Sequence, residues 1–328
     1  MNYREIQEQR ELDTLSPFAT KSADSKGRLT NEPKCDQRTD FQRDRDRVIH
    51  SKAFRRLSHK TQVFLSPTTD HFRTRLTHTL EVSQIGRAIA RGLLLNEDLE
   101  EALALSHDLG HTPFGHTGER ALNEICPLGF THYEQSLRVV DTIEKLNLTF
   151  EVRDGIVNHA GNNLAETPEG IILKFADRIA YINHDIDDAI RAGVFTEADL
   201  PQSLTDILGK SHRMRINTMI KDIVENSGDG SEIRMSEQVY EAMLGLRSFM
   251  FDYVYTSKFV KKEDEKAENL IFKLYEYFSY NKDKMPLEYV EMLNDFETAR
   301  VVTDYIAGMT DRYAINLFEE LFVPKSFS

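Results

Sequence analysis

The chain has 328 residues, 40% of them hydrophobic, and its 41 basic and 54 acidic side chains give a formal net charge of -13. This composition is typical of a folded globular protein, and the negative charge opposes broad adsorption on nucleic acid or anionic membranes. Cys35 and Cys126 are the only cysteines and lie far apart, which excludes a disulfide framework and a paired-cysteine metal site. Since we find neither an apolar signal core nor an apolar run of membrane-spanning length, we expect a cytoplasmic protein without a membrane partner.

Helical patterns dominate the chain after its first 40 residues. Residues 1–40 are rich in turn formers and charges and predict a surface arm. The segment 76–93 places apolar residues at steps of four or five, which fits a helix and not a strand. These residues are Leu76, Leu80, Ile85, Ile89 and Leu93. Strand-like alternation is scarce, so we predict an all-α fold, with the charged stretch 260–269 as a mobile junction before a helical C-terminal portion.

A histidine-rich segment, HDLGHTPFGHTGE, occupies residues 107–119. The segment before it has a candidate N-cap in Asn96 or Asp98 and acidic residues in its first turn, which predicts a helix, and Gly110 predicts that this helix ends at His107 and Asp108. An adjacent histidine and aspartate that face a core are costly unless something satisfies both groups. The alternative is a polar loop that happens to contain three titratable rings.

Four residues form a candidate metal site. His78 lies on the predicted helix at 76–93, His107 and Asp108 end the next helix, and Asp177 lies on a later one. Separate helices of a bundle can bring such side chains to one buried point. Two imidazoles and two carboxylates suit manganese, magnesium, iron, nickel, cobalt or zinc without distinguishing among them. Taken alone, His78 would more often be a buried structural histidine.

The order of these four residues resembles the HD superfamily of metal-dependent phosphohydrolases. The stretches TRLTHTLEV, HDLGHTPFGHTGE and DRIAYINHDIDD resemble its dGTPase-like branch, the deoxynucleoside triphosphate triphosphohydrolases. The resemblance implies a multi-helix HD-domain bundle, with an N-terminal arm at 1–40, an HD-type phosphohydrolase domain at 41–250 and a helical C-terminal region at 251–328. It also implies a divalent metal cofactor and water attack on the α-phosphate of a dNTP, which releases a deoxynucleoside and inorganic triphosphate.

His116 and Glu119 are the candidate acid–base pair, because a carboxylate can fix the imidazole tautomer so that the ring handles a proton. Triphosphate hydrolysis also requires cationic groups. Arg75 lies three residues before His78 on the same helix face and is the first choice for a phosphate contact. A basic block offers more charge, although paired surface charges would look the same. The block consists of Arg43, Arg45, Arg47, Lys52, Arg55, Arg56 and Lys60.

The resemblance implies further residues around the triphosphate. It adds His111 to the catalytic residues and places His111 and His132 along the phosphates. The resemblance also implies that Arg178 faces the triphosphate. However, one step along a helix from Asp177 rotates the side chain by about 100°. For His132, a role as the cap of the following helix is an equal alternative.

A second set of residues is a candidate for binding the sugar. Asp177, Tyr181 and Asp185 stand at steps of four, which predicts one shared helix face. By resemblance, Tyr181 packs beneath the deoxyribose, and Asp185, together with Gln62, binds the 3′-hydroxyl. The alternative is a buried polar helix face in a large bundle. The preferred base is not predicted.

Other functions remain open on the sequence alone. The same metal-binding set serves nucleoside monophosphatases, cyclic-nucleotide phosphodiesterases and guanosine polyphosphate hydrolases. A non-catalytic nucleotide sensor or single-strand nucleic-acid binder would use the basic block. A purely structural helical protein would not explain the four candidate ligands. The resemblance further implies a homo-oligomer, with an activating nucleotide bound at subunit contacts.

Overall fold

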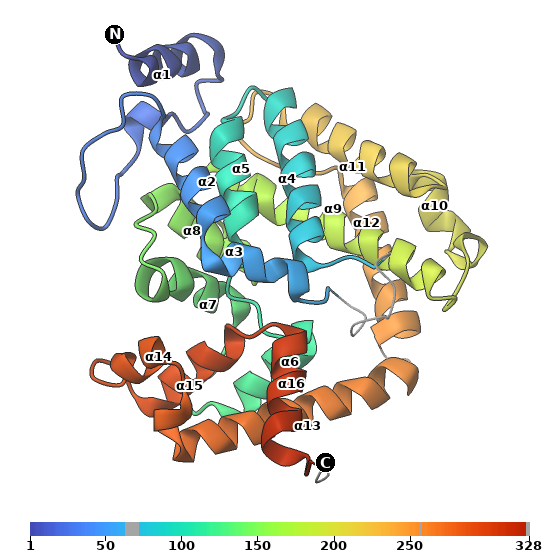
Figure 1. Ribbon diagram of the computed structural model, residues 1–328. Coiled ribbons are helices and arrows are strands. Elements are labelled where there is room, and N and C mark those ends of the chain that lie inside the picture. Colours follow the sequence, from blue (N-terminus) through green and yellow to red (C-terminus); the bar gives the residue numbers. More distant parts are fainter. Residues whose placement is uncertain (63–71, 256–257, 326–328) are drawn as a thin grey trace.

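The computed structural model describes residues 1–62, 72–255 and 258–325, and within these ranges it contains sixteen α-helices joined by loops and short 3-10 and π-helical turns. Two isolated β-bridges are the only extended pairings in the part described. The predicted all-α fold is therefore confirmed (Figure 1). None of the described helices is long and apolar enough to cross a membrane.

The helices follow in chain order as α1 (Tyr3–Thr14), α2 (Asp40–His50), α3 (Lys52–Arg56), α4 (Arg75–Gly92), α5 (Glu97–Ser106), α6 (Gly115–Ile125), α7 (His132–Arg138), α8 (Phe150–Asn158), α9 (Pro168–Arg191), α10 (Gln202–Leu208), α11 (His212–Ser227), α12 (Glu237–Met250), α13 (Lys258–Tyr280), α14 (Leu287–Met292), α15 (Thr298–Ala307) and α16 (Asp311–Phe322).

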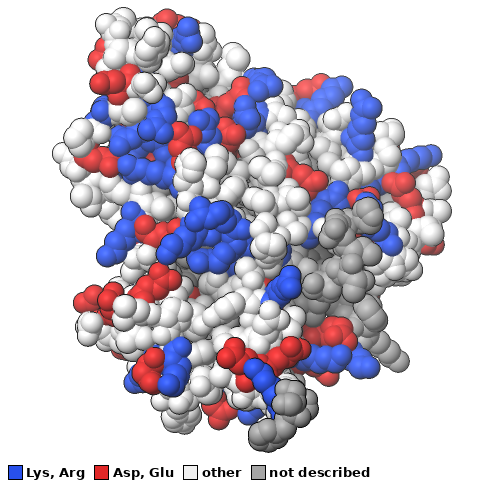
Figure 2. All heavy atoms as spheres, viewed as in Figure 1, with Lys and Arg blue, Asp and Glu red and all other residues white. Residues whose placement is uncertain are grey.

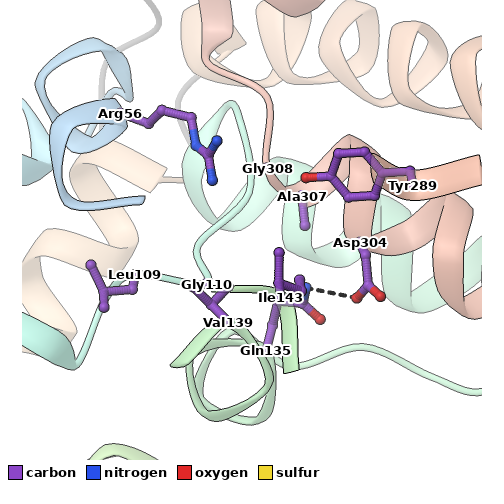
Figure 3. A pocket seen from close by; sticks show the side chains of 10 residues that line it. All are labelled: Arg56, Leu109, Gly110, Gln135, Val139, Ile143, Tyr289, Asp304, Ala307 and Gly308. Atoms are coloured by element: carbon purple, nitrogen blue, oxygen red, sulfur yellow. Dashed lines mark hydrogen bonds between the residues drawn. The ribbon is translucent and has the colours of Figure 1, made fainter. Parts of the chain in front are cut away.

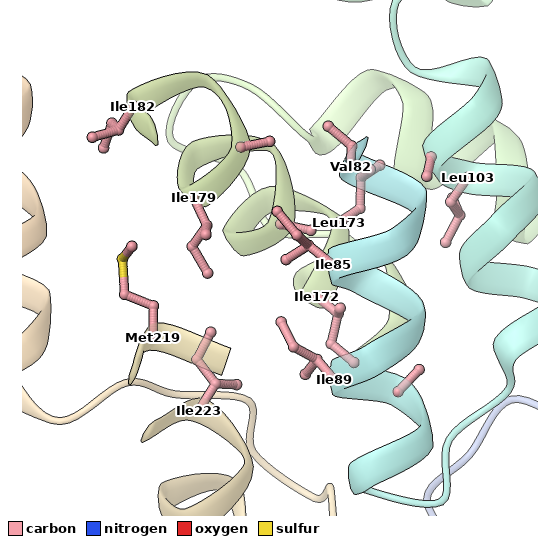
Figure 4. Close-up of a cluster of buried hydrophobic side chains, with 14 of the residues drawn as sticks. Val82, Ile85, Ile89, Leu103, Ile172, Leu173, Ile179, Ile182, Met219 and Ile223 are labelled. Atoms are coloured by element: carbon pink, nitrogen blue, oxygen red, sulfur yellow. The ribbon is translucent and has the colours of Figure 1, made fainter. Parts of the chain in front are cut away.

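Helices α4, α5 and α9 pack against one another at the centre of the larger hydrophobic cluster. Figure 4 shows Ile85 and Ile89 of α4 facing Ile172 of α9, with side chains of α11 closing the other side. Of the predicted apolar stripe, Leu80 is 52% exposed. The prediction that Leu80 belongs to the buried face was wrong. Residue 80 lies two positions, or about 200° around the helix, from the buried residues at 78 and 82.

Local capping sets the ends of the helices that position the site. Asn96 is the N-cap of α5, where its side chain accepts hydrogen bonds from the backbone of Asp98 and Leu99, and α5 ends with His107 as its C-cap. These ends agree with the sequence prediction. Helix α9 begins with a Thr167 cap and a proline in its first turn, and it continues without a break for 24 residues.

A second hydrophobic cluster joins α6 to the C-terminal helices. Leu122 of α6 is buried in the same cluster as Ile271 of α13 and Val301 of α15, and Figure 1 shows α6 among the orange and red C-terminal helices. Residues 260–269 lie within α13 and are helical, with Ala267 buried in the cluster, whereas the mobility predicted for this stretch stays a prediction. The boundary predicted at residue 250 stays a prediction and falls at the end of α12.

The N-terminal arm is anchored by a buried ion pair. The guanidinium of Arg28 contacts the carboxylate of Asp44 on α2 and donates to the carbonyl of Asn147 at 2.6 Å. Asp44 is fully buried and also accepts hydrogen bonds from the backbone and the hydroxyl of Thr149, at 2.8 and 2.7 Å. The pair therefore joins the arm, α2 and the start of α8.

We expect Asp44→Ala to lower the free energy of unfolding by about 3–5 kcal/mol, because it leaves a buried guanidinium without its main partner. Urea unfolding followed by circular dichroism measures this change. Asp46→Ala on the same helix is the control, since Asp46 pairs with Arg38 at a half-exposed site and should cost less than about 1 kcal/mol. Equal losses in the two variants would contradict the anchoring role of Asp44.

Candidate metal centre

Three packed helices bring the four predicted ligands together. His78 lies on α4, His107 and Asp108 follow α5, and Asp177 lies on α9. One nitrogen or oxygen atom from each of His78, His107 and Asp108 lies within 4.8 Å of the others. Asp177 Oδ1 is 3.1 Å from His78 Nε2 and 3.9 Å from His107 Nε2. All four donor groups thus surround one small region.

The hydrogen bonds of this cluster suit a cation. His107 Nδ1 lies 2.6 Å from the Ala104 carbonyl oxygen, so Nδ1 carries the proton and Nε2 presents a lone pair. That Nε2 is buried and has no hydrogen-bond partner within the described ranges. A ligating histidine normally makes this bond to a carbonyl through its other ring nitrogen. Two imidazoles with two carboxylates therefore fit a divalent ion.

Both carboxylates of the cluster stay ionised. Burial alone would raise the pKa of Asp108, but the neighbouring guanidinium of Arg75 and the nearby imidazoles hold it well below its usual range. Arg75 Nη1 donates to Asp108 Oδ2 at 2.6 Å, and both side chains are buried. Burial likewise acts to raise the pKa of Asp177, but a hydrogen bond from His78 and the neighbouring imidazoles lower it. The cluster therefore keeps negative charge in an apolar core.

The loop after Asp108 is held by residues from other parts of the chain. Phe114 adopts a left-handed backbone (φ 62°) directly before α6, a conformation that costs free energy for a non-glycine residue. Its backbone N–H donates to Asp311 Oδ1 of α16 at 3.0 Å. Lys60 Nζ, which is fully buried, donates to the carbonyl oxygens of His111 and Ala307, the latter at 2.8 Å. The C-terminal helices thus take part in fixing the loop.

Glu119 connects two histidines. His116 Nδ1 lies 3.1 Å from Glu119 Oε2, which is the contact expected of the acid–base pair. The other oxygen, Oε1, lies 2.8 Å from His132 Nδ1 and accepts the His132 backbone N–H at 2.8 Å. Burial opposes ionisation, but these hydrogen bonds lower the pKa of Glu119 below its usual range. The side chain of His116 is 72% exposed, whereas His111 is buried and stacks on His132 with a centroid distance of 4.8 Å.

The predicted sugar residues share one helix. Tyr181 and Asp185 lie on α9 with Asp177, and Asp185 is buried. Burial raises the pKa of Tyr181 to about 12, so its phenol stays neutral. Gln62 lies beside the start of α6, since a side-chain carbon at Gly115 would come within 3.1 Å of the Gln62 carbonyl oxygen. The sugar-binding roles of Tyr181, Asp185 and Gln62 stay predictions.

The cationic candidates differ in their surroundings. Arg75 is in the cluster, whereas Arg178 Nη1 donates to the Tyr240 hydroxyl at 3.4 Å. Figure 2 shows the basic block over α2 and α3 with acidic side chains among it. Each of its seven side chains contacts a carboxylate or a carbonyl oxygen; for example, Arg47 binds Glu32 and Arg56 approaches Glu144. Paired surface charges therefore explain most of the block.

Two buried histidines at the site were not singled out in the sequence. His159 follows α8, and its ring centroid lies 5.0 Å from that of His107. His184 lies on α9, with its ring centroid 5.8 Å from that of His78 and its Nε2 3.0 Å from Glu81 Oε2. The position of His184 could have been predicted from the sequence, because residue 184 lies seven residues, or two helical turns, after Asp177. No spacing rule connects His159 to the site.

The segment after Asp108 also touches the C-terminal region. Figure 3 shows Gly110 beside α7 and Gln135 hydrogen-bonded to Asp304 of α15, at 2.9 Å. A side-chain carbon at Gly110 would lie 2.1 Å from the Ser136 backbone nitrogen, so only glycine allows this approach. The glycine lets α7 approach closely, and a nitrogen of His132 lies within 4.8 Å of an oxygen of Asp108.

Comparison with known proteins identifies the family. Residues 75–182, which include all four candidate ligands, match the HD domain, and residues 233–320 match the phosphohydrolase-associated domain. A deoxyguanosinetriphosphate triphosphohydrolase-like protein of Caldanaerobacter subterraneus is 56% identical, over 99% of this chain and 97% of that protein. A protein of the same description from Desulfatibacillum aliphaticivorans is 49% identical, over 99% of both chains.

The chain belongs to the deoxyguanosinetriphosphate triphosphohydrolase-like family of HD-domain phosphohydrolases. Solved structures of lower identity agree with the fold of this family member. A phosphohydrolase from Bacteroides thetaiotaomicron superposes with a TM-score of 0.54 at 19% identity, over 85% of this chain and 68% of that one. A hypothetical protein from Aquifex aeolicus gives 0.51 at 23% identity, over 86% and 68%.

We expect His107→Ala to reduce the number of divalent ions that the triphosphohydrolase-like protein retains, because it removes an inward lone pair from the cluster. Mass-spectrometric metal analysis after loading and dialysis measures the bound ions. His184→Gln is the matched control, since it removes another buried imidazole next to His78 but leaves the cluster intact. Unchanged metal content in His107→Ala would remove His107 from the ligand set.

Proposed function

We propose that this family member hydrolyses deoxynucleoside triphosphates to a deoxynucleoside and inorganic triphosphate. The observation that carries the proposal is the short path from the metal cluster to the acid–base pair. Asp108 and His132 offer ligand atoms within 4.8 Å of each other, His132 binds Glu119, and Glu119 binds His116. The descriptions of the relatives support the same substrate class.

His78, His107, Asp108 and Asp177 would hold the divalent ion. When bound there, the ion would supply Lewis-acid stabilisation of charge on the phosphate. The remaining steps belong to side chains of this chain. Phosphoryl transfer is catalysed mainly by positioning and by charge stabilisation, and the cluster combines both at the meeting point of rigid helices.

Arg75 is the residue that we assign to the triphosphate. Its Nη1 is bound to Asp108, while its buried Nε and Nη2 have no hydrogen-bond partner in the described part of the chain. Two unused donors of one guanidinium match two oxygens of a phosphate. Arg178, His111 and His132 complete this side in the proposal, with His111 and His132 stacked on each other.

His116 handles the proton in the proposed reaction. Water attacks the α-phosphorus and gives a proton to His116 Nε2, the bond from phosphorus to the 5′-oxygen breaks, and His116 passes that proton to the 5′-oxygen of the departing deoxynucleoside. Glu119 binds Nδ1 and so fixes the tautomer and orientation of the ring. The exposed position of His116 is suited to a group that meets a substrate at the mouth of the site.

The shared face of α9 would bind the sugar and select deoxyribose over ribose. Tyr181 would pack beneath the deoxyribose, where its bulk disfavours a 2′-hydroxyl, and Asp185, together with Gln62, would bind the 3′-hydroxyl. Asp177 stands four residues before Tyr181, so the distance from metal to sugar is set by the pitch of one continuous helix.

Product analysis tests the reaction and the substrate together. We expect the Mn²⁺-loaded protein to convert dNTPs to deoxynucleosides and inorganic triphosphate, with lower kcat/KM for ribonucleotides. Chromatography of the nucleoside product and of the released phosphate species distinguishes the outcomes. Release of orthophosphate or pyrophosphate instead of triphosphate would indicate another type of HD phosphohydrolase.

We expect His116→Ala to lower kcat by about 10² to 10⁴-fold, the usual effect of a positioned acid–base group, and to retain metal and substrate binding. Glu119→Gln should cause part of this loss, and the double variant should be little worse than His116→Ala, because the two residues act as one unit. Single-turnover rates measure these effects. His50→Ala, an exposed histidine on α2, is the control, and losses that simply multiply in the double variant would contradict the pairing.

A further inference from the structure

One carboxylate of the C-terminal helices binds two segments that border the candidate site. Asp311 is the first residue of α16 and is 4% exposed. Its Oδ1 accepts the backbone N–H of Phe114 at 3.0 Å. Its Oδ2 accepts the backbone N–H of Thr61 at 2.9 Å and also the Thr61 hydroxyl. Two segments that are distant in the sequence are thus bound by the two oxygens of one buried side chain.

The segment that contains Thr61 is paired with the start of α4. Thr61 forms an antiparallel bridge with Thr74, and the backbone N–H of Arg75 donates to the Lys60 carbonyl oxygen at 3.0 Å. Arg75 is the residue assigned to the triphosphate, and its Nε and Nη2 have no hydrogen-bond partner in the described part of the chain. The Asp311 carboxylate therefore holds the segment against which the backbone of Arg75 is fixed.

The segment that contains Phe114 leads to the proposed proton-transfer residue. Phe114 has a left-handed backbone, with φ 62°, and Gly115 follows with φ 57° as the first residue of α6. A non-glycine residue keeps this conformation only where its surroundings hold it. The hydrogen bond to Asp311 supplies such a restraint two residues before His116.

The two segments also contact each other. A side-chain carbon at Gly115 would lie 3.1 Å from the Gln62 carbonyl oxygen and 3.2 Å from Arg75 Nη2. These distances are shorter than an ordinary van der Waals contact, so the missing side chain lets the guanidinium lie against the start of α6. A shift of either segment would therefore change the separation between Arg75 and His116.

We propose that Asp311 is a positioning residue that sets the place of the Arg75 guanidinium relative to the His116 imidazole. The effect on turnover rests on the proposed function, whereas the hold on the two segments does not. The role requires an acceptor at both oxygens. An asparagine offers one acceptor oxygen and one donor nitrogen, so it can bind only one of the two segments and turns an N–H toward the N–H of the other.

Kinetics of the Mn²⁺-saturated full-length protein test the effect on turnover. Asp311→Asn should lower kcat for dNTPs by about 10 to 100-fold, because small displacements of reacting groups are costly. Bound metal should be unchanged by mass-spectrometric analysis. Asp283→Asn removes a carboxylate whose side chain is 77% exposed in the same region, and this control should keep the wild-type rate.

A double variant separates positioning from general destabilisation. If Asp311 acts partly through His116, the change Asp311→Asn should cost less in the His116→Ala protein than in the wild type, because the two losses share one cause. A residue that only stabilises the fold would give losses that multiply. Multiplied losses, or a wild-type kcat in Asp311→Asn, would overturn the proposal.

Hydrogen exchange measures the hold on the two segments without turnover. In Asp311→Asn the backbone amide of Thr61, of Phe114 or of both should exchange about 10-fold faster or more, because at least one of them loses its acceptor. Peptides of α5 should be unchanged. Faster exchange in a protein whose wild type releases no triphosphate would refute the proposed reaction alone, and unchanged exchange would refute the role of Asp311 alone.

A second variant covers a failure to fold. If circular dichroism shows that Asp311→Asn has lost its helices, Thr61→Val takes its place, since it removes one donor to Oδ2 and leaves Asp311 intact. The same faster exchange at residue 61 and the same shared loss with His116→Ala are then expected. If both variants unfold, the wild type decides, and unprotected amides at Thr61 and Phe114 overturn the proposal.

Discussion

The burial of carboxylates between α4, α5 and α9 is the constraint on which the rest of the site depends. Moving an isolated carboxylate out of water costs several kcal/mol even after relaxation, and Asp108 is almost fully buried. Arg75 offsets part of this cost as a neighbouring positive charge, and it lies on the same helix as His78. The apolar contacts of Ile85 and Ile89 hold α4 at a fixed distance from α9, so the charged groups cannot relax away from one another. A bound cation would compensate the negative charge that Arg75 does not neutralise.

The site is built by both hydrophobic clusters of the molecule. The candidate ligands come from helices of the larger cluster, but α6, which carries His116 and Glu119, is packed in the cluster of the C-terminal helices. Asp311 and Lys60 both bind the connecting loop, and burial lowers the pKa of Lys60 to about 7. The position of the candidate ligands relative to His116 and Glu119 thus depends on both hydrophobic clusters. A helix outside the matched HD segment, α16, therefore helps to position the loop that leads to α6.

Local features of the site could be predicted from the sequence, whereas long-range ones could not. The end of α5 at His107 followed from the Asn96 cap and the glycine at 110, which act over a few residues. His159 escaped prediction because only the packing of α8 against α5 brings it to His107. The partners of the basic block were equally inaccessible, since Arg56 meets Glu144, 88 residues further along the chain. Helix α13 formed where a charged junction was expected, because an apolar face containing Ala267 met a partner that the local sequence does not reveal.

The two carboxylate oxygens of Glu119 contact two histidines that lie in different helices, His116 and His132. Oε2 orients His116 at the exposed side of the site, and Oε1 fixes the tautomer of His132 on the inner side. His132 lies beside His159 and Asp108, so the same carboxylate positions both the exposed ring of His116 and an inner ring next to the candidate ligands. A neutral amide at position 119 would offer one acceptor oxygen and a donor in place of two acceptors, so it could satisfy only one of the two rings in its present tautomer. The geometry therefore links the two histidines through one side chain, and both contacts depend on the ionised state that the low pKa of Glu119 maintains.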